Sequence, residues 1–127
     1  MKPVDQKTFG DPGGNCMSAC IASLLDLSIE DVPYFGSEIE EYNNNLDIFL
    51  LDRGLIAITF LNNSDWVPKC FHIMGGRTGM GASHAVVGVN GEMIHNPNRL
   101  DRSSLKIVED YTILVPLDPG EWTRKEK

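Results

Sequence analysis

The sequence feature with the clearest chemical meaning is a cysteine at the expected start of a helix. Cys16 follows the turn-rich residues 10–14 (Gly-Asp-Pro-Gly-Gly), and Asn15 stands directly before it as an expected N-cap. A helix N-terminus favours the thiolate, the nucleophilic form of cysteine, through unpaired N–H groups and a partial positive charge. The glycines would let a substrate carbonyl approach the backbone, so that the N–H of Cys16 could donate to a developing oxyanion. We therefore expect Cys16 to be a catalytic nucleophile.

A thiol nucleophile needs a base from elsewhere in the fold, and the candidate is His84. It begins an expected strand soon after the glycine-rich residues 75–81, and a strand end beside a loop is an exposed place. An imidazole also needs a partner on its second nitrogen, which fixes the tautomer. Asn96 on the expected return strand is the candidate for this orienting role. We expect the glycine-rich residues to form a mobile lip over the site.

The register of the hairpin decides whether Asn96 reaches His84. With a two-residue turn at Asn90-Gly91, the side chain of Asn96 would face away from His84. With a three-residue loop closed by a G1 bulge, His84 would fall opposite Asn96. Gly88 would then pair with Glu92. We predict the bulged hairpin, because it brings the two polar side chains together.

The first part of the chain follows helical patterns. Apolar or small residues recur at helical spacing in residues 16–25, which predicts a first helix. Residues 28–31 predict one short capped turn. Ser37 and Glu40 form a capping-box signature, and the apolar residues after them predict a second helix that ends before Gly54.

The second part of the chain follows strand patterns. Short apolar, β-branched runs predict strands at residues 55–61, 69–74, 84–89, 92–96 and 111–117. Helices that precede strands favour an α+β domain, in which N-terminal helices pack on a small antiparallel sheet. No internal repeat or linker divides the chain, so we expect a single domain over residues 1–127, with residues 119–127 as a frayed tail.

The composition argues against several classes of function. The chain has 127 residues, a hydrophobic content of 42% and a formal net charge of −7. The negative charge would repel nucleic acids and anionic membranes, so we expect neither as a partner. Residues 1–7 lack the apolar stretch of a secretion signal, and no later window approaches a membrane span, so we expect a cytoplasmic protein. The odd number of cysteines, 3, does not predict a disulfide framework.

Three short motifs, in this order, carry a resemblance to a known family: residues 14–20 (Gly-Asn-Cys-Met-Ser-Ala-Cys), 84–89 (His-Ala-Val-Val-Gly-Val) and 94–97 (Ile-His-Asn-Pro). Together they resemble the papain-like cysteine peptidases, and above all the small C39-like group of bacteria and their phages, over roughly residues 5 to 97. The resemblance implies a papain-like α+β fold and hydrolysis of a peptide or related amide bond through a thioester. It also implies a peptide or protein substrate and no required cofactor or metal.

The resemblance also implies roles for Gln6 and Asn96. The family places a glutamine before the nucleophile, where its side-chain N–H₂ helps to hold the oxyanion, and Gln6 is the candidate. Its separation from Cys16 is longer than is usual in the family, so residues 11–14 would have to bulge outward. Asn96 stands where C39-like proteins commonly carry Asp and papain carries Asn. An asparagine would orient His84 but stabilise its positive charge less than an aspartate does.

The remaining cysteines and histidines have structural explanations. Cys20 lies one turn deeper in the first expected helix, and Cys70 lies in an expected strand. We expect both to pack as small hydrophobes. His72 and His95 are expected to be half-exposed strand residues, each with a hydrogen bond to backbone or water. We assign none of the four a role in catalysis.

Two other functions would use these residues differently. A structural zinc site is one, because zinc favours tetrahedral sets of cysteine and histidine, and its ligands would be Cys16, Cys20, Cys70 and His72. The spacing of these residues is not a common zinc arrangement, and such a site leaves His84 unexplained. The other is a catalytically silent papain-like binding module, such as an inhibitor of a host enzyme, since a fold does not guarantee chemistry.

Overall fold

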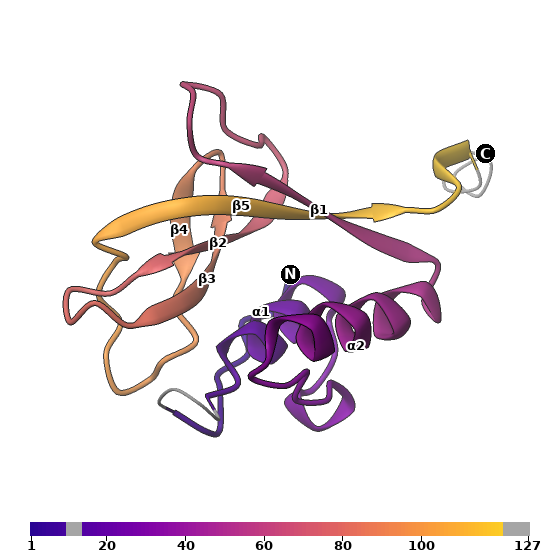
Figure 1. Cartoon of the computed structure of the whole chain (residues 1–127), viewed down its shortest axis with the longest axis horizontal. Helices are drawn as coiled ribbons and strands as arrows, with labels where there is room; N and C mark the ends of the chain where they lie inside the picture. The colour runs from indigo at the N-terminus through magenta and orange to yellow at the C-terminus, as the bar shows by residue number, and fades with distance from the viewer. Residues whose placement is uncertain (10–13, 121–127) are drawn as a thin grey trace.

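Figure 1 shows the computed structural model of the chain, which describes residues 1–9 and 14–120. Its elements are α1 (Cys16–Leu25), the 3₁₀ turn η1 (Ile29–Asp31), α2 (Ile39–Leu51), β1 (Leu55–Leu61), β2 (Phe71–Arg77), β3 (Ser83–Val89), β4 (Glu92–His95) and β5 (Ile107–Pro116). The strands form one antiparallel sheet in the order β1-β5-β2-β3-β4, and both α-helices lie on one side of it. The predicted α+β class is therefore confirmed.

Two predictions about the whole chain, the absence of a membrane span and a frayed C-terminal tail, can be compared with the structure only in part. No helix within the described residues has the length and the apolar composition needed to cross a membrane. The described residues end at 120, so the predicted frayed tail at 119–127 lies almost entirely outside them.

The helix α1 begins at Cys16, as predicted, and Asn15 is its N-cap residue. Among the described residues, the Asn15 side chain makes no capping bond within the helix. Its Oδ1 instead accepts hydrogen bonds from the backbone N–H of Lys7 at 2.9 Å and of Thr8 at 3.1 Å. The backbone N–H of Asn15 in turn donates to the Thr8 carbonyl at 3.2 Å. These bonds hold the N-terminal segment beside the start of α1 and therefore beside Cys16.

The start of α2 differs from the prediction. Its N-cap residue is Glu38, whose carbonyl accepts the first helical bond from the Tyr42 N–H at 2.8 Å. The predicted capping box at Ser37 is wrong, because Ser37 lies one residue before the position that a capping side chain must occupy. The Asn45 side chain donates to the Phe35 carbonyl at 2.9 Å. This bond ties the segment before α2 to the helix.

All five predicted strands are present, but β2 is displaced toward the glycines. It runs through Gly75 and Gly76, so the predicted lip at residues 75–81 is wrong for the part that belongs to the strand. Position 76 requires glycine, because a Cβ there would lie 1.9 Å from the carbonyl oxygen of Ile107. The strands β2 and β5 therefore approach each other more closely at this point than side chains would allow.

The hairpin between β3 and β4 also differs from the prediction. Asn90 and Gly91 have φ angles of 54° and 79°, as in a two-residue type I′ turn. Gly88 pairs with Met93 rather than with Glu92. The predicted three-residue loop is therefore wrong, and the Asn-Gly pair forms the turn that is most common for this dipeptide.

A bulge farther along the same hairpin restores the predicted contact. The register shifts between Val87 and Gly88, so that Val87 pairs with His95. The shift leaves one extra residue in β4 and reverses the faces of the residues that follow it. The strand ends at His95, so Asn96 does not pair with His84 as predicted. Its side chain nevertheless comes to the side of the ribbon that His84 occupies.

Two clusters of buried side chains hold the helices and the sheet together. The larger cluster packs α1 and α2 against the sheet and includes Ile73 and Val87. The smaller cluster lies on the other side of the sheet and includes Met74 and Val86. Neighbouring residues alternate between the clusters because successive side chains of a strand point to opposite faces. This packing fixes the position of the α1 N-terminus relative to the strands.

Candidate active site

Cys16 and His84 line the same cavity, which has a volume of about 770 Å³. Cys16 is the first residue of α1, and His84 is the second residue of β3. Residues 34–37, the helix α2 and the strands β1, β2 and β5 contribute the other walls. Cys16 and His84, the two residues predicted from the sequence, therefore line one cavity from two different elements.

The alternation along β3 shows how His84 approaches this cavity. Ala85 belongs to the cluster on the helix side of the sheet, and Val86 belongs to the cluster on the other side. Because side chains alternate along a strand, the side chain of His84 points to the same face of the sheet as that of Val86. His84 lies at the end of β3, however, and contributes to the cavity that Cys16 lines. The imidazole can therefore approach the cavity only around this end of β3.

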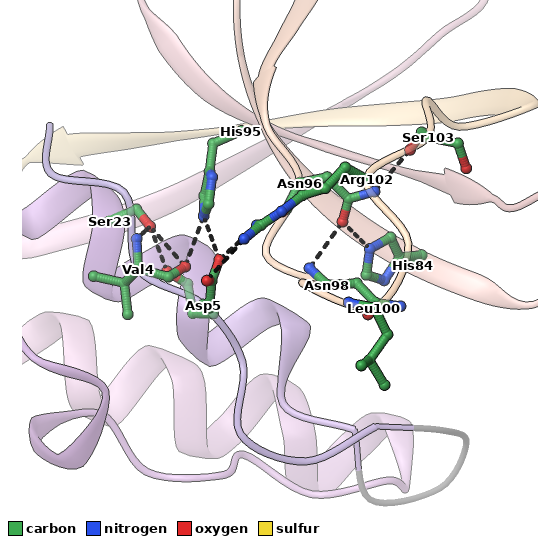
Figure 2. Close-up of polar contacts among 11 residues, drawn as sticks. Val4, Asp5, Ser23, His84, His95, Asn96, Asn98, Leu100, Arg102 and Ser103 are labelled. Carbon is green, nitrogen blue, oxygen red and sulfur yellow. Dashed lines mark hydrogen bonds and ion pairs between the residues drawn. The ribbon is translucent and has the colours of Figure 1, made fainter.

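A hydrogen bond joins His84 to Asn96, as Figure 2 shows, with Nε2 of the imidazole 2.8 Å from Oδ1 of the amide. The amide has a single orientation, because its Nδ2 donates to the Ser103 carbonyl at 2.7 Å. Its Oδ1 also accepts from the Asn98 N–H at 3.0 Å. An amide oxygen only accepts hydrogen bonds, so Nε2 of His84 carries the proton. In the neutral imidazole, Nδ1 is then the nitrogen that can act as a base.

Contacts to the N-terminal segment hold Asn96 in place (Figure 2). Arg102 donates to the Asn96 carbonyl at 2.5 Å and forms a bidentate pair with Asp5 at 2.6 and 2.9 Å. Next to this pair, Nε2 of His95 donates to the Val4 carbonyl at 2.8 Å. The hydrogen bond from Arg102 lowers the pKa of Asp5 below its ordinary value, and the same bond raises the pKa of Arg102. The residue that orients the imidazole is thereby joined to the segment that lies beside α1.

Gln6 lies close to the start of α1, although it is not among the described residues that line the cavity. Its side chain is buried, and Nε2 donates to the Thr8 carbonyl at 2.8 Å, the carbonyl that also accepts from Asn15. Within the described part of the chain, its Oε1 has no hydrogen-bond partner. The outward bulge predicted at 11–14 lies mostly outside the described residues. The oxyanion role of Gln6 stays a prediction.

The other two cysteines have opposite environments. Cys20 is fully buried, which confirms that it packs as a small hydrophobe. Burial raises the pKa of its thiol well above the ordinary value, and the nearby Cys16 adds to the rise. Cys70 is exposed, so the prediction that it packs in a strand is wrong. The reason is that β2 begins only at Phe71.

The other two histidines also differ from each other. His72 is fully buried rather than half-exposed, so that prediction is wrong. Its Nε2 accepts from the Gly91 N–H at 3.2 Å, and its ring packs edge-on against Tyr111 with centroids 5.3 Å apart. Burial lowers the pKa of His72 below its ordinary value. The backbone hydrogen bond predicted for His95 is confirmed by its bond to Val4.

The structure does not assemble the alternative zinc site. In the part of the chain that is described, no three His, Cys, Asp or Glu side chains are grouped so that they could hold a metal ion. Cys20 is enclosed in the core, whereas Cys70 is exposed. Nε2 of His72 already accepts the hydrogen bond from Gly91. The zinc interpretation is therefore wrong.

Two side chains of the cavity were not identified as site residues from the sequence: Tyr42 on α2 and Asp110 on β5. Burial raises the pKa of each above its ordinary value. The strand predicted at residues 111–117 does not include Asp110. In the observed strand, Asp110 shares a face with Thr112, which also lines the cavity. An ionisable residue on the core-facing side of a strand is the signal that identifies Asp110 once the strand is extended.

The cavity therefore combines a thiol at a helix N-terminus, an imidazole with a fixed tautomer and a carboxylate. Thiols activated by an imidazole base are nucleophiles that attack carbonyl carbons in cysteine hydrolases. No protein-family model, curated protein or solved structure matches this chain.

Proposed function

We propose that this chain is a papain-like cysteine hydrolase that cleaves a peptide or related amide bond through a thioester. The observation that carries the proposal is the hydrogen bond between His84 and Asn96, which leaves Nδ1 of the imidazole as the base. Cys16 supplies a thiol at a helix N-terminus in the same cavity. A nucleophile on the first helix, followed by a histidine and an asparagine from the sheet, supports the papain-like form of the α+β fold.

Acylation uses three groups of the chain. Nδ1 of His84 accepts the proton of the Cys16 thiol, and the thiolate attacks the carbonyl carbon of the substrate. The carbonyl oxygen becomes an oxyanion, to which the backbone N–H of Cys16 donates. Nε2 of Gln6 has a second N–H besides the one bonded to Thr8, and this group is the candidate for a second donor. The imidazolium then protonates the departing amine, and a thioester to Cys16 remains.

Deacylation reverses the direction of proton transfer. Nδ1 of His84 accepts a proton from water, and the hydroxide attacks the thioester carbonyl. The Cys16 thiolate leaves and recovers the proton from His84, and a carboxylic acid is released. Asn96 keeps the imidazole in one tautomer through both steps, because its Oδ1 accepts from Nε2 throughout.

Alkylation by iodoacetamide at neutral pH tests this proposal, with the exposed Cys70 as an internal reference. We expect Cys16 to react at least about tenfold faster than Cys70, because the helix N-terminus and His84 increase the thiolate fraction. The variant His84→Ala should bring Cys16 close to the rate of Cys70. The control His95→Gln should leave the rate unchanged, since a glutamine can still donate to Val4. Mass spectrometry of the digested protein gives both rates from one sample.

Equal rates for Cys16 and Cys70 in the wild-type chain would contradict the hydrolase proposal. The catalytically silent binding module would then be the better description of this cavity. A fast Cys16 that is insensitive to His84→Ala would instead remove the imidazole from the mechanism.

A further inference from the structure

The cavity that holds Cys16 contains a carboxylate with no role in the proposed hydrolysis. Asp110 lies on β5 directly opposite Gly75 of β2. Gly75 leaves room for the carboxylate, because a Cβ at that position would lie 2.4 Å from Oδ1 of Asp110. The backbone N–H of Gly75 is a hydrogen-bond donor to this carboxylate. The carboxylate of Asp110 therefore lies over the backbone of β2, on the helix side of the sheet.

The charged residues that line the cavity favour a bound cation. The cavity lining includes three carboxylates, Asp47, Glu109 and Asp110, and in the described part of the chain it includes no Lys or Arg. Arg77 lies 3.6 Å from Glu109 and offsets that charge in part. Within the same described residues, Asp110 forms no ion pair.

The raised pKa of Asp110 also favours a positive charge beside its carboxylate. Burial raises its pKa, and the neighbouring Glu109 raises it further. Both causes oppose the charged carboxylate, and a cation placed beside it would counter both. The carboxylate is also close to Tyr42, whose pKa it helps to raise after burial and the two thiols.

Apolar side chains of the same cavity are suited to the alkyl chain that would carry such a cation. Tyr42 and Leu46 of α2 and Ala57 of β1 line the same cavity. A cavity that combines apolar walls with a carboxylate matches an alkyl chain that ends in a positive group, as in the side chain of lysine or arginine.

We propose that Asp110 forms a cation subsite beside Cys16, which selects amide substrates that carry an ammonium or guanidinium group on an alkyl chain near the scissile bond. This inference rests on the proposed hydrolase function, because it names the substrate class of the same cavity. The pairing of a partly buried carboxylate with a cation adds a charge-assisted hydrogen bond, which is stronger than a neutral one.

A matched pair of electrophiles tests the subsite without a known substrate. The chloroacetamide of agmatine carries a guanidinium at the end of a butyl chain, and N-hexyl chloroacetamide is its neutral counterpart. In both, a cysteine thiolate displaces chloride and forms a C–S bond. We expect the guanidinium probe to alkylate Cys16 about tenfold faster than the hexyl probe, after each rate is divided by that of Cys70. Asp110→Asn should reduce this preference to about onefold, because a neutral amide lacks the charge.

The control variant is Asp47→Asn, which removes an exposed carboxylate of the same cavity. We expect it to keep most of the preference, because an exposed charge is screened by solvent. An unchanged preference in Asp110→Asn, or no preference in the wild-type chain, would overturn the subsite. Failure of the hydrolase proposal has a different signature, which is slow alkylation of Cys16 by the neutral hexyl probe relative to Cys70.

A second measurement uses only the wild-type protein. Free agmatine should slow the alkylation of Cys16 by the hexyl probe, and hexanol at the same concentration should not. No protection by agmatine, at concentrations where ionic strength is held constant with sodium chloride, would overturn the subsite even if Asp110→Asn failed to fold.

Discussion

At the scale of single residues, the amide of Asn96 sets the chemistry of the imidazole. It is buried, and all of its polar atoms are used: Nδ2 by the Ser103 carbonyl, and Oδ1 by His84 and Asn98. These hydrogen bonds explain why this position holds an asparagine rather than an aspartate. A carboxylate could accept from His84, but it could not donate to Ser103.

We therefore expect Asn96→Asp to destabilise the fold by about 1–3 kcal/mol, because it leaves the Ser103 carbonyl without its donor and places an oxygen beside it. The free energy of unfolding in urea measures this loss. Asn98→Asp is the matched control, because within the described residues the Asn98 side chain only accepts a hydrogen bond, from the Leu100 N–H at 2.9 Å. A destabilisation of the same size in both variants would contradict the role assigned to Nδ2.

At the scale of elements, the close approach of β2 to β5 at Gly76 shapes one wall of the cavity. The register of this pair shifts between Gly75 and Gly76, and the backbone of β5 occupies the space that a side chain at 76 would need. The shift leaves Gly75 opposite Asp110. The absence of a side chain at Gly75 and Gly76 therefore leaves the space in which the Asp110 carboxylate enters the cavity.

Gly76→Ala should lower the free energy of unfolding by about 3 kcal/mol, since its Cβ cannot fit unless the two strands separate. Gly79→Ala is the control, because a Cβ at Gly79 meets nothing within 4 Å among the described residues. Urea unfolding of the two variants makes the comparison. Similar stabilities for both would show that β2 and β5 can move apart at little cost.

At the scale of the whole molecule, the buried His72 makes stability depend on pH. It packs against Tyr111 on β5 and accepts from the turn at Gly91, so it connects three parts of the sheet. Burial lowers its pKa from the ordinary value of 6.5. Below pH 6.5 the unfolded chain binds a proton at this histidine that the folded chain does not bind. The stability that the neutral, buried His72 contributes is therefore lost as the pH falls toward the lowered pKa.

The variant His72→Gln should remove this dependence, because a glutamine oxygen can accept from Gly91 and does not titrate. Between pH 6.5 and the lowered pKa, the wild-type chain should lose up to about 1.4 kcal/mol per pH unit relative to the variant. Other groups, such as Asp110 with its raised pKa, titrate in both chains and cancel in the comparison. Parallel curves of unfolding free energy against pH would contradict this role for His72.

Local patterns in the sequence determined much of this fold. A cap residue before periodic apolar positions is a short-range signal, and α1 begins at Cys16 as predicted. The apolar run at 55–61 likewise became β1 with the predicted bounds. The order of a helix-borne cysteine, a strand-borne histidine and a following asparagine was also readable, because each depends on neighbouring residues alone.

Only the tertiary structure decided how these elements meet. The hairpin predicted from the sequence has its bulge in the turn at Asn90-Gly91, whereas in the structure the bulge lies between the pairs Gly88–Met93 and Val87–His95. Both arrangements bring Asn96 to the side of His84, since either adds one residue and reverses the faces of the strand. The exposure of Cys70, the burial of His72 and the entry of Asp110 into the cavity were not predictable. Each depends on which strand lies alongside, and strand pairing joins residues that are far apart in the chain.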